Sequence, residues 1–167
     1  MVYSAPFCIR HSPLNKKLKT AIILELLLLP ENQHFMKVKL IVFDIAGTTV
    51  QDKDEVLICF SQACRQSGII TTDARLNALM GVSKLEVFQL LWHEQLGFDA
   101  PDYLIESKAA FSFETFRAIL EKYYHENPVL PTIGALEIFE WARQNGIHIA
   151  LNTGFYRKVT DIILGKL

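Results

Sequence analysis

Two short apolar runs in the chain predict neighbouring strands of a parallel sheet. The first run covers residues 40–43 and the second covers residues 147–151. Continuous apolar runs of this length are typical of parallel strands that are covered on both faces. Gly47 ends the first run, because glycine accepts backbone conformations that other residues resist. A helical stretch precedes the second run, so we expect a right-handed crossover to join the two strands.

Between and after these runs, apolar residues recur at helical spacing. Four helices are expected before residue 127, and they cover residues 52–67, 72–79, 83–92 and about 107–125. A fifth opens at residues 131–134 and ends at 145–146, and a last helix follows the second strand. The fourth helix is rich in aromatic residues, and we expect its apolar side to fill a core with Phe111, Phe113, Phe116, Ile119, Leu120 and Tyr123.

The order of these elements predicts an α/β fold in which an all-helical cap is inserted into a small parallel core. Residues 36–53 and 128–167 form the partial α/β core, and residues 54–127 form the helical cap. A core of only two strands leaves a sheet edge open.

Residues 1–35 differ from the rest and are interpreted as an atypical N-terminal extension. Three lysines precede the apolar run 21–29, which contains Glu25 and stops at Pro30. The run is far shorter than the roughly 20 residues that cross a bilayer, and no small-x-small cleavage site follows it. An accessory helix and a leader outside the fold both agree with this pattern.

Composition restricts the class of ligand. Among 167 residues, 50% are hydrophobic and 21% are charged, and the formal net charge is -1. A chain of this length has room for one domain with a small insert, and its charge provides no broad field for nucleic acid. Three cysteines without zinc-site spacing indicate a reducing, cytoplasmic setting. We therefore expect a small-molecule ligand, no membrane association and no nucleic acid, and a homodimer is an oligomeric state that the sequence leaves open.

Both predicted strands end in small polar residues that can carry chemistry. Asp44 ends the first strand, and Asn152, Thr153 and Gly154 follow the second. Open parallel sheets bind ligands beyond the carboxyl ends of their strands, where these two segments would lie side by side. A carboxylate beside a hydroxyl and backbone N–H groups suits attack on phosphorus. The simpler alternative is that Asp44 only caps the next turn.

The segment Asp-Ile-Ala-Gly-Thr-Thr at residues 44–49 and Thr153 after the second strand resemble the first two motifs of the haloacid dehalogenase (HAD) superfamily. The resemblance covers about residues 36–167. It implies a Rossmann-like core with a helical cap, Asp44 as nucleophile, Thr153 as a second catalytic residue, and Mg²⁺ held by the Asp44 carboxylate and the Ala46 carbonyl. It also implies that the phosphoryl group is oriented by Gly47, Thr48, Thr49 and Gly154.

Ala46 occupies the position at which most phosphatases of this superfamily have a second Asp, the general acid/base. The sequence is similar in this respect to the phosphonatase branch, whose cap lysine forms a Schiff base with phosphonoacetaldehyde. Residues 80–84, Met-Gly-Val-Ser-Lys, resemble the lysine-bearing cap segment of that branch. This implies a catalytic Lys84, with Gly81 and Ser83 beside the substrate. Val87 departs from the branch, which has histidine there, and an ordinary solvated lysine is the alternative for Lys84.

The resemblance implies a Mg²⁺-dependent hydrolase of a small phosphorylated or phosphonate metabolite. The third and fourth motifs of the superfamily would follow Thr153 by several tens of residues, and the chain given stops at Leu167. A truncated, catalytically incomplete fragment or non-enzymatic remnant is therefore one alternative. An ordinary phosphate-ester phosphatase of the phosphoglycolate phosphatase or β-phosphoglucomutase type is another. A receiver domain also carries Asp at a strand end, but it has no place for the helical insertion.

Overall fold

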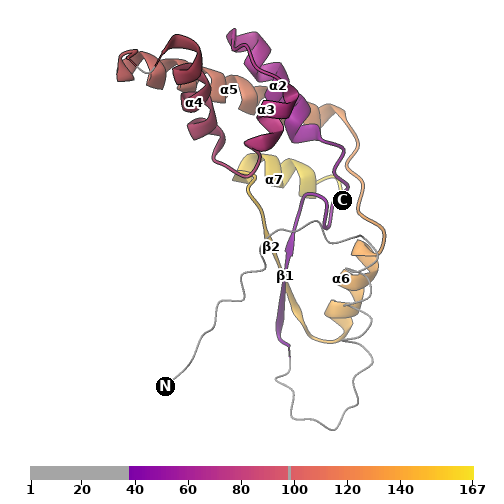
Figure 1. The fold of residues 1–167 in the computed structure, drawn as a ribbon. Coiled ribbons are helices and arrows are strands. Elements are labelled where there is room, and N and C mark those ends of the chain that lie inside the picture. Colours follow the sequence, from indigo (N-terminus) through magenta and orange to yellow (C-terminus); the bar gives the residue numbers. More distant parts are fainter. Residues whose placement is uncertain (1–37, 98) are drawn as a thin grey trace, which may run out of the picture. The chain divides into compact units, whose positions relative to one another are not determined.

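The computed structural model describes residues 38–97 and 99–167, and Val38–Leu167 form one compact unit (Figure 1). The predicted N-terminal extension, residues 1–35, lies outside the described residues. In chain order the elements are β1 (Leu40–Asp44), α2 (Glu55–Ser67), α3 (Asp73–Ala78), α4 (Lys84–Leu96), α5 (Asp102–Glu126), α6 (Ala135–Gln144), β2 (His148–Asn152) and α7 (Arg157–Leu164).

The strands β1 and β2 form a parallel pair, as the apolar runs predict. Their register aligns Leu40 with His148 at one end and Asp44 with Asn152 at the other. The two strands therefore deliver their last residues to the same edge of the sheet.

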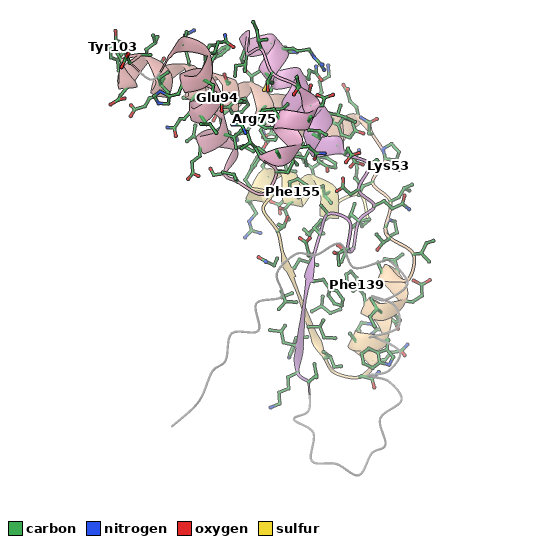
Figure 2. All side chains as sticks on the ribbon, in the orientation of Figure 1. Lys53, Arg75, Glu94, Tyr103, Phe139 and Phe155 are labelled. Atoms are coloured by element: carbon green, nitrogen blue, oxygen red, sulfur yellow. The ribbon has the colours of Figure 1, made fainter. Side chains whose placement is uncertain are left out.

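Only one face of β1 is covered by the described residues, so the prediction of a strand covered on both faces is wrong. On the covered face, the Phe43 ring meets Phe139 of α6 edge-on, with 5.3 Å between ring centroids; Figure 2 labels Phe139 on α6. On the opposite face, Leu40 is 53% and Val42 is 57% exposed. The alternation arises because successive strand residues point to opposite sides, and α6 packs against one side only.

Helices α2 and α4 both pack along α5 in the helical region. Three phenylalanines, one from each helix, form the centre of its core. The ring centroid of Phe60 lies 4.9 Å from that of Phe88 and 5.7 Å from that of Phe116. An ion pair between Arg75 and Glu94 also joins α3 to α4 (Figure 2).

Helix α5 begins five residues before the predicted start at residue 107, directly after Pro101. Proline suits the first turn of a helix, and Asp102 adds a negative charge where the helix dipole favours one. The prediction that Phe111 fills the core is wrong, since its side chain is 65% exposed. The buried side of α5 is instead defined by Ile105, Ala109, Ser112, Phe116, Leu120 and Tyr124.

Helix α2 ends at Ser67, as predicted, and Gly68 is its C-cap. The φ of Gly68 is 78°, and its N–H contacts the carbonyl oxygens of Cys64 and Arg65. Cys59 and Cys64 are buried in the core on the same helix, and burial raises the pKa of each thiol to about 11. Across the described residues, no helix is long and apolar enough to cross a membrane.

Candidate active site

Strand β1 places Asp44 at the carboxyl end of the sheet, beside its register partner Asn152. The side chain is exposed, and its Oδ1 accepts a hydrogen bond of 2.8 Å from the N–H of Ile45. This bond is the turn cap that the simpler interpretation of Asp44 requires. It uses one carboxylate oxygen, and no other hydrogen bond to this carboxylate comes from residues 38–97 or 99–167. The cap therefore leaves Oδ2 able to react.

The loop after Asp44 is closed by its own backbone hydrogen bonds. The N–H groups of Thr48, Thr49 and Val50 all donate to the Ile45 carbonyl, and that of Gly47 donates to Val50. Gly47 has a φ of 71°, which explains glycine at the turn. The Thr49 side chain is buried and its hydroxyl lies 3.3 Å from the same Ile45 oxygen.

These bonds occupy the N–H groups of the loop, and none of Gly47, Thr48 and Thr49 lines the neighbouring cavity. Their assignment to phosphate binding stays a prediction.

A cavity of about 650 Å³ lies next to Asp44. Segments far apart in the sequence line it: the end of β1, the segment before α4, the middle of α5 and the loop after β2. The structure thus brings together seven of the predicted site residues, namely Asp44, Ala46, Gly81, Ser83, Lys84, Thr153 and Gly154.

Thr153 follows β2 directly and shares the cavity with Asp44. Its Oγ1 accepts a hydrogen bond of 3.1 Å from the N–H of Phe155. This contact fixes the hydroxyl oxygen while its hydrogen remains available for an acceptor. The side chain can therefore donate to a phosphoryl oxygen in the cavity.

Lys84 is the first residue of α4, and it lines the cavity from the helical side. Nζ lies 5.3 Å from the centroid of the Phe60 ring and 3.4 Å from the Val82 carbonyl oxygen. Burial lowers the pKa of Lys84 below its ordinary value, because the charged form loses hydration. No ion pair joins Lys84 to any residue of the described ranges.

Val87, one turn further along α4, is 1% exposed and belongs to the core. A side chain at this position therefore does not line the cavity in this structure.

The cavity also contains residues that the sequence analysis placed in the core or left without a role: Val56, Phe113, Phe116, Leu120, Phe155 and Tyr156. Helical spacing cannot separate a side chain facing the core from one facing a cavity, since both are apolar. For Tyr156, the only sequence feature that pointed to the cavity was its position shortly after Thr153 and Gly154.

Tyr156 links the loop after β2 to α5. Its hydroxyl donates to Oε1 of Glu121 at 2.8 Å, and Lys158 forms an ion pair with the same carboxylate. Burial and this hydrogen bond raise the pKa of Tyr156. Burial by itself would raise the pKa of Glu121, but the hydrogen bonds from Lys158 and Tyr156 outweigh it and lower the pKa. The arrangement keeps the hydroxyl of Tyr156 protonated.

The described residues contain no cluster of three or more His, Cys, Asp or Glu side chains that could hold a metal ion. Asp44 and Ala46, the predicted Mg²⁺ ligands, both line the cavity. Mg²⁺ usually keeps several waters and binds through one or two carboxylates together with substrate oxygens. One carboxylate and one carbonyl oxygen fit such a site.

No protein-family model and no curated protein matches the sequence. Solved structures do resemble it, including a hydrolase from Pseudomonas syringae with a TM-score of 0.60 and 16% identity, covering 78% of this chain and 56% of that chain. A predicted phosphoglycolate phosphatase from Haemophilus somnus 129pt has a TM-score of 0.59 and 16% identity, covering 78% and 58%.

A third similar structure is the HAD hydrolase, family IA, variant 3 from Entamoeba histolytica HM-1:IMSS, with a TM-score of 0.53, 19% identity and coverage of 77% and 54%. This chain thus spans little more than half the length of each of these three proteins. The described part of the chain has the α/β fold of the HAD hydrolases, a Rossmann-like core with a helical cap.

Proposed function

We propose that the protein hydrolyses a small phosphate ester or phosphonate, with Asp44 as the nucleophile. The observation that supports this most strongly is the shared cavity. The exposed carboxylate of Asp44, the hydroxyl of Thr153 and the amine of Lys84, whose pKa is lowered, come to this cavity from three separate parts of the chain. Attack on phosphorus needs such groups held in position.

The proposed reaction has two steps. An oxygen of Asp44 attacks phosphorus, and the new O–P bond forms as the bond to the leaving group breaks with its electron pair. Water then attacks the phosphorus of the acyl phosphate, loses a proton, and releases phosphate with the free carboxylate. Thr153 donates its hydroxyl hydrogen to a phosphoryl oxygen in both steps.

Asp44 and the Ala46 carbonyl are the residues that would hold Mg²⁺ here. When bound, the ion would neutralise charge on the phosphoryl oxygens. Because Ala46 cannot act as an acid, another residue must protonate the leaving group. Lys84, which lines the same cavity, has a proton to give in its ammonium form.

The lowered pKa of Lys84 supports a narrower proposal, cleavage of the carbon–phosphorus bond in a phosphonate that carries a carbonyl group. The neutral amine would attack the carbonyl carbon, and water would leave as the imine forms. The protonated imine would then accept the electron pair of the breaking C–P bond while Asp44 takes the phosphorus. Protonation and hydrolysis of the resulting enamine would free Lys84.

Asp44→Asn tests the general proposal. Phosphate release from a panel of phosphate esters and phosphonates, measured with Mg²⁺ present, should fall by roughly three orders of magnitude or more. Asp161→Asn is the control, because Asp161 is exposed and pairs only with Arg157 at the surface. Equal activity of Asp44→Asn and wild type would overturn the assignment.

Borohydride separates the two versions of the reaction. With an aldehyde phosphonate as probe, reduction should leave an adduct on Lys84 that peptide mass spectrometry locates. Lys108→Arg should leave the adduct intact, whereas Lys84→Arg should abolish it. Phosphate release without any adduct on Lys84 would support ester hydrolysis instead.

A rival proposal is that this chain is catalytically incomplete by itself. It is supported by the single carboxylate in the cavity and by the chain's coverage of 56% of the Pseudomonas syringae hydrolase. Calorimetric titration with Mg²⁺ distinguishes the proposals. A one-carboxylate site should bind only in the millimolar range in the absence of substrate, whereas an active site should also show phosphate release that stops with EDTA and returns with Mg²⁺.

A further inference from the structure

We infer that the organic part of the substrate is an uncharged, apolar group. This inference rests on the proposed function, since it takes the phosphoryl group to lie beside Asp44. It concerns the opposite wall of the same cavity, which decides which leaving group fits.

Most of the side chains that line this wall are apolar. Helix α5 provides Phe113, Phe116 and Leu120, and Val56 comes from α2. The segment before α4 adds two apolar side chains that are partly exposed to water, Met80 at 37% and Val82 at 45%. An apolar ligand would remove these surfaces from water and gain roughly 25 cal/mol for each Å² covered.

The cavity has no second cation for a second anionic group. Asp44 and Lys84 are its charged lining residues among the described positions. Three cations on α5 and α7 form ion pairs, Arg117 with Glu114, Lys158 with Glu121 and Arg157 with Asp161, and none of the three lines the cavity. If Lys84 assists the leaving group, a carboxylate or second phosphate on the substrate would lie there without a partner, which is costly.

The wall is equally poor in hydrogen-bonding groups for a sugar. The Tyr156 hydroxyl already donates to Glu121, and Thr153 lies at the phosphoryl end. Among the side chains that line the apolar wall, Ser83 then remains as a hydrogen-bond partner for a sugar hydroxyl. A sugar phosphate would bury several hydroxyls against Phe113, Phe116 and Leu120, and each hydroxyl without a partner weakens binding.

Binding of four probes in the presence of Mg²⁺ tests this inference without requiring turnover. The probes are inorganic phosphate, benzylphosphonate, phosphonoacetate and glucose 6-phosphate, titrated into the full 167-residue chain by calorimetry. We expect benzylphosphonate to bind about tenfold more tightly than phosphate, since a buried ring face contributes about that factor. Phosphonoacetate and glucose 6-phosphate should bind no more tightly than phosphate.

Two matched phenylalanine variants locate the apolar wall. Phe113→Ala should remove most of the tenfold preference for benzylphosphonate, while phosphate binding stays unchanged. Phe111→Ala is the control on the same helix, because Phe111 is exposed and does not line the cavity. If Phe113→Ala fails to fold, Val82→Ser serves instead, since Val82 is exposed at the cavity and precedes α4.

The outcomes separate this inference from the proposed function. In one outcome, Asp44→Asn weakens phosphate binding, but phosphonoacetate or glucose 6-phosphate binds as tightly as benzylphosphonate or more tightly. This outcome would overturn the inference and leave the proposed function in place. The same follows if Phe113→Ala and Val82→Ser both leave the preference intact. If none of the four probes binds, the proposed function fails and the inference fails with it.

Discussion

Lys84 carries an ionisable group in a partly buried position, so its protonation should affect the stability of the folded chain. Its ordinary pKa is 10.5, and burial lowers the value in the folded chain. The nearby Phe60 ring offers the ammonium only a weak partner at 5.3 Å. The folded state therefore bears a desolvation cost whenever Lys84 is charged.

We predict a specific pH dependence of stability from this shift. Between the lowered folded pKa and 10.5, the unfolded chain binds more protons than the folded chain, so the free energy of unfolding contributed by Lys84 rises with pH. Below that window both states are protonated and the cost is fully present. Urea unfolding of wild type and Lys84→Met should show wild type gaining relative stability as pH rises toward 10.5. A constant difference across this range would contradict the shift.

A buried hydrogen bond in the helical region gives a second residue-scale prediction. Trp92 Nε1–H donates to Ser112 Oγ at 3.0 Å, and Ser112 is fully buried. Ser112→Ala leaves the indole N–H without its acceptor and should lower the free energy of unfolding by about 1–3 kcal/mol. Ser107→Ala, on the exposed side of α5, should change it by less than about 0.5 kcal/mol. Equal effects in chemical denaturation would show that the bond contributes nothing.

At the residue scale, the sequence was informative where a side chain follows a strand or a glycine-rich segment. Asp44 and Thr153 could be singled out in this way, and Lys84 by the resemblance of residues 80–84 to a cap segment. The structure places all three at one cavity. The link from Tyr156 to Glu121 could not be predicted, because it joins residues 35 positions apart that share no motif. Such contacts depend on how α5 passes the loop after β2.

At the element scale, the turn residues in the sequence predicted the ends of several helices well. Gly68 is a left-handed C-cap directly after the predicted helix end at residue 67. Thr72, the predicted first residue of the next helix, is its N-cap and accepts from Arg75 N–H. The start of α5 was predicted less well, because residues 102–106 show no apolar spacing that distinguishes helix from loop. Pro101 is a local signal for this helix start, because proline suits the beginning of a helix.

Gly68 provides the prediction at this scale. Gly68→Ala should destabilise the protein by about 1 kcal/mol, because its φ of 78° is unfavourable for a residue with Cβ. The added methyl group meets no atom within 4 Å, so the cost is one of backbone conformation. Gly154→Ala is the matched control, since its φ lies outside the left-handed region and its surroundings are equally open. Equal thermal unfolding of the two variants would contradict this explanation.

At the scale of the whole molecule, the two-stranded sheet has an apolar face without cover from the described residues. The parallel pairing could be predicted from the two apolar runs, but the burial of the strands could not. A continuous run such as residues 40–43 is typical of a strand covered on both sides, and the covering elements are not encoded in the run itself. Leu40 and Val42 remain exposed for this reason.

This face leads to a prediction about self-association. Exposed apolar strands with open edges favour pairing between copies, so the 167-residue chain should show concentration-dependent association in sedimentation velocity. Val42→Lys should reduce it, because a charge would then lie in the contact. Ile70→Lys, at an isolated position that is 90% exposed, should leave it unchanged. A monomer at all concentrations would contradict the prediction.

The role of Asp44 as nucleophile is the central claim, and an acyl phosphate at this residue is its most direct evidence. Borohydride quenching during turnover reduces an aspartyl phosphate to homoserine, which peptide mass spectrometry locates. We predict homoserine at position 44 in wild type and none there in Asp44→Asn. Phosphate release accompanied by homoserine at a different carboxylate, or by none, would contradict the account.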